Sequence, residues 1–227
     1  EASPVKIVVV HIPYLINLAT SYDVLYQKSI AAYIEDMKET ARLGAQYLVT
    51  HMGSYKNSSK EAGTKQFIAA LDIILTETKG LGVKLLLENT AGSGHWLGAT
   101  FDQHQRIINS VKHPECLGVC LDTAHAFAAG FDIRKPDVFD DLIAQIGGKC
   151  GSDALKVVHL NDSLSALGSL ADRHTHIGKG EIGLKAMKHI VNHPGLAEAT
   201  FILETPKETP RSDRMNLNRV RRLLARI

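Results

Sequence analysis

Short apolar runs alternate along the chain with longer segments in which apolar residues recur at helical spacing. Six runs have the pattern of buried strands, at residues 6–12, 46–52, 83–89, 117–123, 155–161 and 200–205. The expected helices lie at residues 26–43, 58–80, 101–111, 136–147, 184–191 and 211–226. Nearly continuous apolar strands separated by helices are typical of a covered parallel sheet. The pattern predicts an α/β fold, a TIM-type (β/α) barrel formed by one domain over residues 1–227.

Local signals bound several of the expected helices. The run Ser58-Ser59-Lys60-Glu61 has the pattern of a capping box at the start of a helix. Pro136 suits the first turn of the helix that follows it, and Gly147-Gly148 is expected to end that helix.

The strand count falls short of a closed barrel. A barrel of this type needs about eight strands, and the sequence predicts six. The strands at residues 6–12 and 200–205 would then be open edges, and open edges invite pairing with another strand. We expect an incomplete barrel, completed by an upstream segment or by self-association of two chains along these edges.

Each predicted strand has a metal-capable residue at its carboxyl end. These residues are His11, His51, Glu88, Asp122, His159 and Glu204. One such carboxylate is usually a helix cap, and one such histidine is usually a satisfied buried group. In a barrel, however, the carboxyl ends of all strands meet at one mouth. Six together therefore indicate a metal site.

A polar loop adds further candidate ligands after the fifth strand. Asp172 and His174 are two residues apart, so in extended backbone their side chains point to the same side. With His125 they bring the candidate ligands to nine, which is too many for one ion and suits three. Mixed imidazole and carboxylate ligands favour Zn²⁺, or Mn²⁺ at some positions, over Ca²⁺ and Mg²⁺. Clustered metal ions suit the hydrolysis of a phosphodiester.

Composition adds few constraints. The chain has 227 residues, a net charge of +2 and a pI near 8.4, which permits an anionic partner without requiring one. Three cysteines without a spaced framework argue for a reducing compartment. No apolar run approaches the roughly 18 residues of a membrane span. We therefore expect a soluble, intracellular protein that does not bind a membrane.

Several motifs resemble those of the endonuclease IV family. They are His11-x-x-Tyr14-Leu-Ile-Asn17, Leu87-Glu88-Asn89-Thr90-Ala91-Gly92, Asp122-Thr-Ala-His125, His159-Leu-Asn-Asp162-Ser163, Asp172-Arg173-His174 and Leu203-Glu204-Thr205. Those enzymes are TIM-barrel nucleases with three zinc ions, and they cut double-stranded DNA on the 5′ side of abasic sites during DNA repair. The resemblance implies a DNA repair endonuclease that leaves a 3′-hydroxyl by way of a metal-activated hydroxide.

The resemblance also implies how the ligands are shared. One ion would be held by His11, His51 and Glu88. Glu88 would bridge to a second ion, whose other ligands would be Asp122, His159 and Glu204. The third ion would be held by His125, Asp172 and His174. Among these residues, the carboxylates Glu88, Asp122 and Glu204 are the expected catalytic groups.

Four residues are expected to bind DNA by the same resemblance. They are Tyr14, Asn17, Arg173 and Lys179. Tyr14 would enter the minor groove near the lesion, although a loop tyrosine packed on the barrel rim is an equally common arrangement. The loops at residues 92–98 and 173–183 would line the DNA.

Two departures and two alternatives stand beside this interpretation. The barrel of the family begins with two further strands, which this chain is expected to lack, and the loop after them supplies part of the DNA contact. After His51 the chain has Met-Gly-Ser-Tyr where the family usually has Pro-Gly-Ser-His, which changes a neighbour of the ligand but not the ligand. The ligands Glu88, Asp122, His159 and Glu204 alone would resemble the single-metal site of a sugar isomerase or epimerase of the xylose isomerase-like superfamily. Such an enzyme has no need of the other predicted ligands. A DNA-binding or zinc-storage protein without catalysis is a third interpretation, which turnover on a defined substrate would separate.

Overall fold

The computed structural model describes residues 6–13 and 15–225, so the predicted DNA contact Tyr14 lies outside the described residues. The contacts of the chain define two compact units. The first unit comprises Glu1–Glu88 and Gly94–Val119, and the second comprises Asn89–Ser93 and Cys120–Ile227. The one-domain organisation expected from the sequence stays a prediction.

Parallel strands form the centre of the first unit. These strands are β1 (Val9–His11), β2 (Tyr47–His51) and β3 (Lys84–Glu88), in the order β1-β2-β3. The next strand, β4 (Leu117–Asp122), begins in this unit and ends in the second. Every residue of β4 is buried, as expected for a strand that is covered on both faces.

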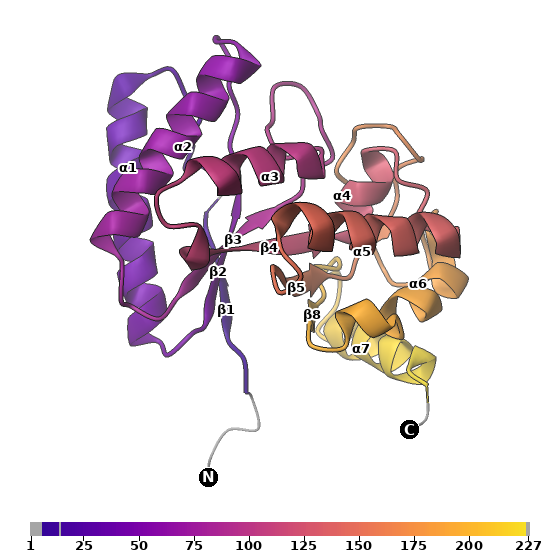
Figure 1. Cartoon of the computed structure of the whole chain (residues 1–227). Coiled ribbons are helices and arrows are strands. Elements are labelled where there is room, and N and C mark those ends of the chain that lie inside the picture. The colour runs from indigo at the N-terminus through magenta and orange to yellow at the C-terminus, as the bar shows by residue number, and fades with distance from the viewer. Residues whose placement is uncertain (1–5, 14, 226–227) are drawn as a thin grey trace. The chain divides into compact units, whose positions relative to one another are not determined.

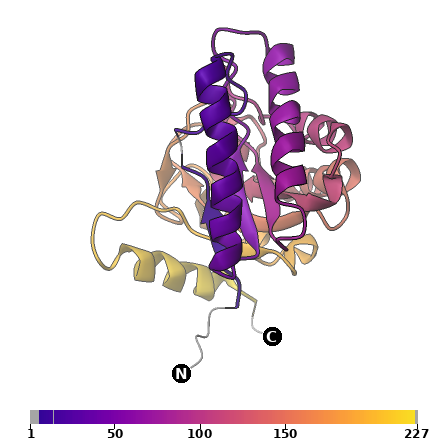
Figure 2. The same ribbon diagram turned by 90° about the vertical axis from the view of Figure 1, so that its left-hand side faces the viewer.

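Helices cover the strands of the first unit. They are α1 (Asp23–Arg42), α2 (Lys60–Glu77) and α3 (Phe101–Ser110). Figures 1 and 2 show α1 and α2 side by side against these strands. Tyr33 and Met37 of α1 and Phe67 and Leu71 of α2 are almost completely buried. Their spacing of four residues places each pair on one helix face, which is the face that forms the core.

The second unit continues the alternation of strands and helices. Its strand order is the end of β4, then β5 (Leu155–His159), then β8 (Thr200–Ile202), and β5 and β8 are parallel. Its helices are α4 (Thr123–Ala128), α5 (Pro136–Cys150), α6 (Gly183–Val191) and α7 (Ser212–Leu223). In Figure 1, α6 and α7 pack against each other near the C-terminal end of the chain. A short antiparallel ribbon, β6 (Asp162–Ser163) with β7 (His174–Thr175), lies outside the main sheet.

All six predicted strands are confirmed, each one to four residues shorter than expected. Five of them end at the metal-capable residue that was expected near the carboxyl end, namely at His11, His51, Glu88, Asp122 and His159. The sixth strand, β8, ends at Ile202, so Glu204 lies in the loop that follows it. The six predicted helices are also present, while α4, the ribbon β6–β7 and the 3₁₀ turns Pro114–Cys116 and Pro194–Leu196 were not predicted.

Two predicted helix boundaries are wrong. Helix α5 does not end at Gly147-Gly148, because it continues to Cys150 and the left-handed residue is Gly151, with φ of 108°. The cap of α2 is Ser59 rather than Ser58, and its side chain accepts a hydrogen bond from the Ala62 N–H. Glu61 therefore does not complete a capping box, and it pairs instead with Arg106 of α3.

None of the helices formed by residues 6–13 and 15–225 is long and apolar enough to cross a lipid bilayer.

The buried His104 of α3 makes the stability of the first unit depend on pH. Burial lowers its pKa to about 4, and the hydrogen bond of its Nδ1 to the Thr100 carbonyl offsets only part of this. Because the unfolded chain binds a proton near pH 6.5 and the folded chain does not, stability is lost as the pH falls from 6.5 toward 4.

The variant His104→Leu tests this dependence on pH. The free energy of unfolding of the unchanged protein should fall between pH 7 and pH 5, and in the variant this fall should be smaller by about 2 kcal/mol. Urea unfolding at both pH values measures this difference, and an equal loss in both proteins would contradict it.

Candidate metal centre

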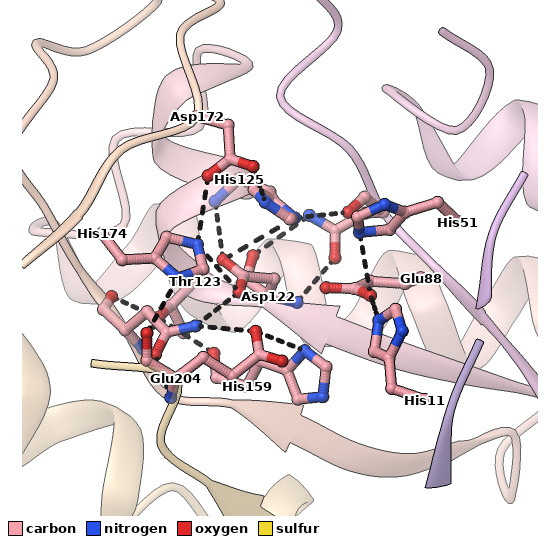
Figure 3. A network of polar contacts seen from close by, with 12 residues as sticks. His11, His51, Glu88, Asp122, Thr123, His125, His159, Asp172, His174 and Glu204 are labelled. Carbon is pink, nitrogen blue, oxygen red and sulfur yellow. Dashed lines mark hydrogen bonds and ion pairs between the residues drawn. The ribbon is translucent and has the colours of Figure 1, made fainter. Parts of the chain in front are cut away.

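The first unit brings two imidazoles onto one carboxylate oxygen. The Nε2 atoms of His11 and His51 lie 3.0 Å and 3.1 Å from Oε2 of Glu88, and their rings meet edge to face with centroids 5.4 Å apart. Figure 3 shows both rings directed at Glu88. The strand register explains this contact, because His51 lies directly opposite Glu88 in the parallel pair β2–β3. These three residues form ligand group A.

The chemistry of ligand group A fits a metal ion. Nδ1 of His11 lies 2.8 Å from the Ile12 carbonyl, so this nitrogen carries a hydrogen, and in the neutral imidazole Nε2 has a lone pair. That lone pair points at an oxygen of the buried Glu88 carboxylate, which also has only lone pairs to offer. A divalent cation among these atoms would bind all of them, and the Ile12 carbonyl would keep His11 in the tautomer that coordinates.

A small cavity adjoins ligand group A. Its volume is about 130 Å³, and its lining consists of His11, Ile12, Pro13, Ile16, Thr50, His51 and Trp96. The Trp96 ring meets the His51 ring edge to face, with centroids 6.1 Å apart. The cavity has room for water or a small group beside both imidazoles.

Residues 52–55, which depart from the family motif after His51, include residues that contact a neighbouring loop of the same unit. Met52 is fully buried, and Ser54 forms a β-bridge with Trp96. The Tyr55 N–H donates to the His95 carbonyl at 3.0 Å, and the two rings meet edge to face. The substituted residues therefore pack within the unit, and His51 keeps its place beside Glu88.

The second unit gathers a carboxylate between two histidines. Nε2 of His125 lies 3.1 Å from Oδ2 of Asp172, and Nε2 of His174 lies 3.2 Å from Oδ1 of the same side chain. Figure 3 shows both rings turned toward Asp172. Oδ2 of Asp122 lies 3.5 Å from Nε2 of His174. Residues His125, Asp172 and His174 form ligand group B.

The electrostatics of ligand group B favour a cation. Burial lowers the pKa of His174, but contact with Asp172 and the charge of Asp122 outweigh burial and raise the pKa to about 9. Contacts with His125 and His174 hold the pKa of the Asp172 carboxyl well below its usual range. Nε2 of His174 is buried without a hydrogen bond of good geometry among the described residues. A metal ion would satisfy this atom and would supply the positive charge that the carboxylates stabilise.

Local structure fixes His125 in ligand group B. Asp122 is the N-cap of α4, and its Oδ1 accepts the backbone N–H of His125 at 2.8 Å. Nδ1 of His125 lies 2.9 Å from the Asn89 carbonyl, which leaves Nε2 directed at Asp172. The cap and the carbonyl together set the position and the tautomer of this imidazole.

A third set of ligands lies at the ends of β4 and β5 and in the loop after β8. Each of Asp122, His159 and Glu204 offers a ligand atom, and these atoms lie within 4.8 Å of one another. Nδ1 of His159 is 3.2 Å from Oε2 of Glu204. These three residues form ligand group C. Asp122 is therefore close both to the other members of group C and to His174 of group B.

Asn161 joins two members of ligand group C and was not predicted as a site residue. Its Nδ2 donates to Oδ2 of Asp122 at 2.6 Å, and its Oδ1 accepts the backbone N–H of Glu204 at 2.8 Å. Thr123 holds the backbone here, because its hydroxyl donates to the Asn161 carbonyl at 2.7 Å. One signal was present in the sequence: Asn161 follows His159 by two residues, a spacing that puts both side chains on one side of extended backbone.

The residues predicted to bind DNA lie in different surroundings. Arg173 and Lys179 are exposed on the loop of the second unit. Both ends of the Asn17 amide are bound within the first unit, since Nδ2 donates to the Ser54 carbonyl and Oδ1 accepts the N–H of Ala19. The DNA contacts of these residues stay predictions.

Sequence comparison places the chain among known proteins. A family model described as the xylose isomerase-like TIM barrel matches residues 2–224. A protein of Chloroflexus aggregans named "Probable endonuclease 4" is 44% identical over 218 residues, which cover 96% of this chain and 76% of that protein. The TIM-barrel fold expected from the sequence is thereby confirmed.

Structural comparison agrees with the sequence. The crystal structure of endonuclease IV from Thermus thermophilus superposes with a TM-score of 0.77 and 35% identity, covering 95% of this chain and 74% of that one. A D-tagatose 3-epimerase-like protein has a TM-score of 0.71 at 18% identity, over 96% of this chain and 78% of its own. At that identity the second match concerns the fold alone.

Asn161→Ala tests whether outer partners support ligand group C. Loss of the amide removes the hydrogen bonds to Asp122 and Glu204, so we expect the affinity of this group for Zn²⁺ to fall about 10-fold to 100-fold. Competition with a coloured chelator measures the affinity, and circular dichroism checks the fold. The exposed Asn218 of α7 provides the control variant Asn218→Ala. Equal affinities in the two variants would show that Asn161 does not support the ligands.

Proposed function

Because the chain belongs to the endonuclease IV family of xylose isomerase-like TIM barrels, we propose that it is a metal-dependent DNA repair endonuclease. It hydrolyses the phosphodiester bond on the 5′ side of an abasic site and leaves a 3′-hydroxyl. The observation that carries the proposal is that imidazoles lie close to carboxylates within each of ligand groups A, B and C.

The proposed cofactor is a set of about three divalent ions, one for each ligand group. Each group combines at least one imidazole with at least one carboxylate. That mixture suits Zn²⁺, with Mn²⁺ able to occupy some positions, and is unlike the all-oxygen sites of Ca²⁺ and Mg²⁺. Of the ligands, Glu88, Asp122 and Glu204 are the proposed catalytic carboxylates.

When bound, such ions lower the pKa of water and neutralise charge on the attacked phosphate. The side chains of this chain would hold each ion within its own ligand group. Glu88 and Asp122 are fully buried, so their charges are poorly screened by solvent. Hydrogen bonds to Asp122 from Asn161 and from the His125 N–H keep that carboxylate from rotating. The ligands are therefore positioned before substrate arrives.

The charge of the proposed centre selects an anion. Three divalent ions carry six positive charges, and the carboxylates Glu88, Asp122, Asp172 and Glu204 carry four negative charges. The difference of about two positive charges favours a phosphodiester over a neutral sugar. The exposed Arg173 and Lys179 add positive charge on the loop of the second unit.

A single-metal sugar isomerase or epimerase is the second candidate. Its support is the fold shared with the D-tagatose 3-epimerase-like protein. Such an enzyme would use one ion, and it would give no role to His11 and His51 of ligand group A or to ligand group B. The close approach of His11 and His51 to Glu88 and of His125 and His174 to Asp172 therefore favours the endonuclease.

Self-association along strand edges remains part of the proposal. Among the described residues, β1 is the terminal strand in the order of the first unit, and β8 is the terminal strand in the order of the second. Ile7 and Val8, beside β1, are exposed apolar residues. An exposed apolar edge is suited to pairing with another strand, including one from a second copy.

Incision and metal content test the proposal together. The purified chain is incubated with a labelled duplex that contains one abasic analogue, and its metal content is measured by elemental analysis. We expect a single cut on the 5′ side and about three ions per chain. Glu88→Ala should lower the incision rate at least about 100-fold because it removes the carboxylate of ligand group A. Glu77→Ala, at the exposed end of α2, is the control.

The outcomes separate the candidate functions. About one ion per chain with turnover of a ketose and no incision would favour the isomerase. Three ions without turnover of either substrate would leave a metal-storage protein.

The salt dependence of DNA binding tests the two exposed cations of the loop. Each phosphate contact releases counterions, so the double variant Arg173→Gln with Lys179→Gln should reduce the slope of log K against log salt by about two. Fluorescence anisotropy with the abasic duplex at several salt concentrations measures this slope. Lys28→Gln with Lys65→Gln, on α1 and α2, makes the same change of charge as a control. A slope that falls equally in both variants would contradict a specific role for the loop.

A further inference from the structure

Asp162 is an acidic residue next to the strand that carries His174, and it does not belong to any ligand group. It is fully buried in β6, three residues after His159. Its two carboxylate oxygens accept hydrogen bonds from the backbone N–H groups of Ser163, Gly178, Gly180, Ile182 and Gly183. The distances lie between 2.8 Å for Gly178 and 3.4 Å for Gly183.

These hydrogen bonds decide what Asp162 can do. Burial of an ionised carboxylate is costly unless hydrogen bonds compensate for the lost water, and five backbone N–H groups provide that compensation. Oδ1 receives three of them and Oδ2 receives two. Because a carboxylate offers about four lone-pair sites, little capacity is left for a metal ion. Asp162 is therefore bound to backbone rather than available as a further ligand.

The backbone around Asp162 connects two functional segments of the second unit. In the ribbon, Asp162 lies opposite Thr175 and Ser163 lies opposite His174, so β6 supports the strand that carries a ligand of group B. Leu164 N–H donates to the Arg173 carbonyl at 2.9 Å, which extends the ribbon toward Asp172. The Asp162 carboxylate also accepts hydrogen bonds from backbone N–H groups of residues 178–183, the turn in which Lys179 is exposed.

Gly180 shows how closely this turn is held. A Cβ atom at this position would lie 2.2 Å from the Ser163 carbonyl oxygen and 2.6 Å from Oδ1 of Asp162. Real Cβ atoms do not approach oxygen atoms so closely, so only glycine permits the hydrogen bond of Gly180 N–H to the carboxylate. The contact therefore needs both the carboxylate of Asp162 and the absence of a side chain at Gly180.

We propose that Asp162 is a positioning residue that fixes ligand group B and the Lys179 turn in one arrangement. The carboxylate holds β6, through which it sets the backbone of His174, and it holds the turn that presents Lys179 to an anionic substrate. Binding of the ion at group B and binding of a DNA phosphate then depend on the same buried contact. This inference rests on the proposed function.

Asp162→Asn is the direct test, because an amide keeps the size of the side chain but has one acceptor oxygen in place of two. Its NH₂ group would face backbone N–H donors, so either the pair from Gly178 and Gly180 or the set at Oδ1 is lost. Gly180→Ala breaks the same contact from the other side. Gly148→Ala in α5, where an added Cβ meets nothing within 4 Å, is the matched control.

Three measurements are made on the chain of 227 residues. Chelator competition with Zn²⁺ alone should show one of about three ions weakened about 10-fold to 100-fold in both test variants. Hydrogen exchange should show faster exchange of the amides at residues 178–183, with unchanged exchange in β2 and β3. The salt slope of duplex binding should fall by about one, as expected when Lys179 is no longer presented.

The outcomes distinguish this inference from a general structural role and from the proposed function. Wild-type affinity for all three ions and a wild-type salt slope in Asp162→Asn would overturn the inference. Equal weakening of all ions together with loss of cooperative unfolding would also overturn it, because Asp162 would then support the whole fold. A wild-type chain that binds no Zn²⁺ would instead contradict the proposed function.

Discussion

The register of parallel strands is the constraint on which ligand group A depends. His51 lies opposite Glu88, and His11 ends the adjacent strand β1, so backbone hydrogen bonds decide which side chains meet. Moving one strand by a single residue would turn its terminal side chain to the other face of the sheet. The apolar core supports this register, because Leu48, Val49 and Leu85 are completely buried and resist such a shift. In the first unit, the packing that stabilises the sheet therefore also fixes the positions of the ligands.

The second unit reaches a similar result by different means. Only Asp122 and His159 end main-sheet strands there, while Asp172 and Glu204 lie in loops and His174 lies in the ribbon. The backbone of a loop is less constrained than that of a sheet, so hydrogen bonds from side chains position the ligands that lie in loops. Asn161 holds the Glu204 backbone, and Thr123 holds the Asn161 backbone. In group C, side-chain hydrogen bonds therefore help to position a ligand, Glu204, that no strand end carries.

The sequence predicted the strand ends well because they follow a simple rule. An apolar run marks a buried strand, and the first polar residue after it marks the strand end, as at Glu88 and Asp122. Asn161 and Asp162 were harder to interpret, since their roles depend on contacts with residues 16 to 43 positions away. The predicted end of α5 was wrong because Gly147 and Gly148 have the pattern of a helix end. The helix continues through both glycines, and the residue with positive φ at its end is Gly151. Propensity describes a residue alone, whereas these features arise from tertiary partners.

The bridge between the loops at Ser54 and Trp96 has a consequence for packing. Tyr55 rests on His95, so the side chain at one of these positions defines the space available to the other. A change at position 55 alone would leave either a gap or a clash in the loop that carries Trp96, one wall of the cavity beside His51. The two positions therefore share one space, so a ring at position 55 fits only together with the ring at position 95.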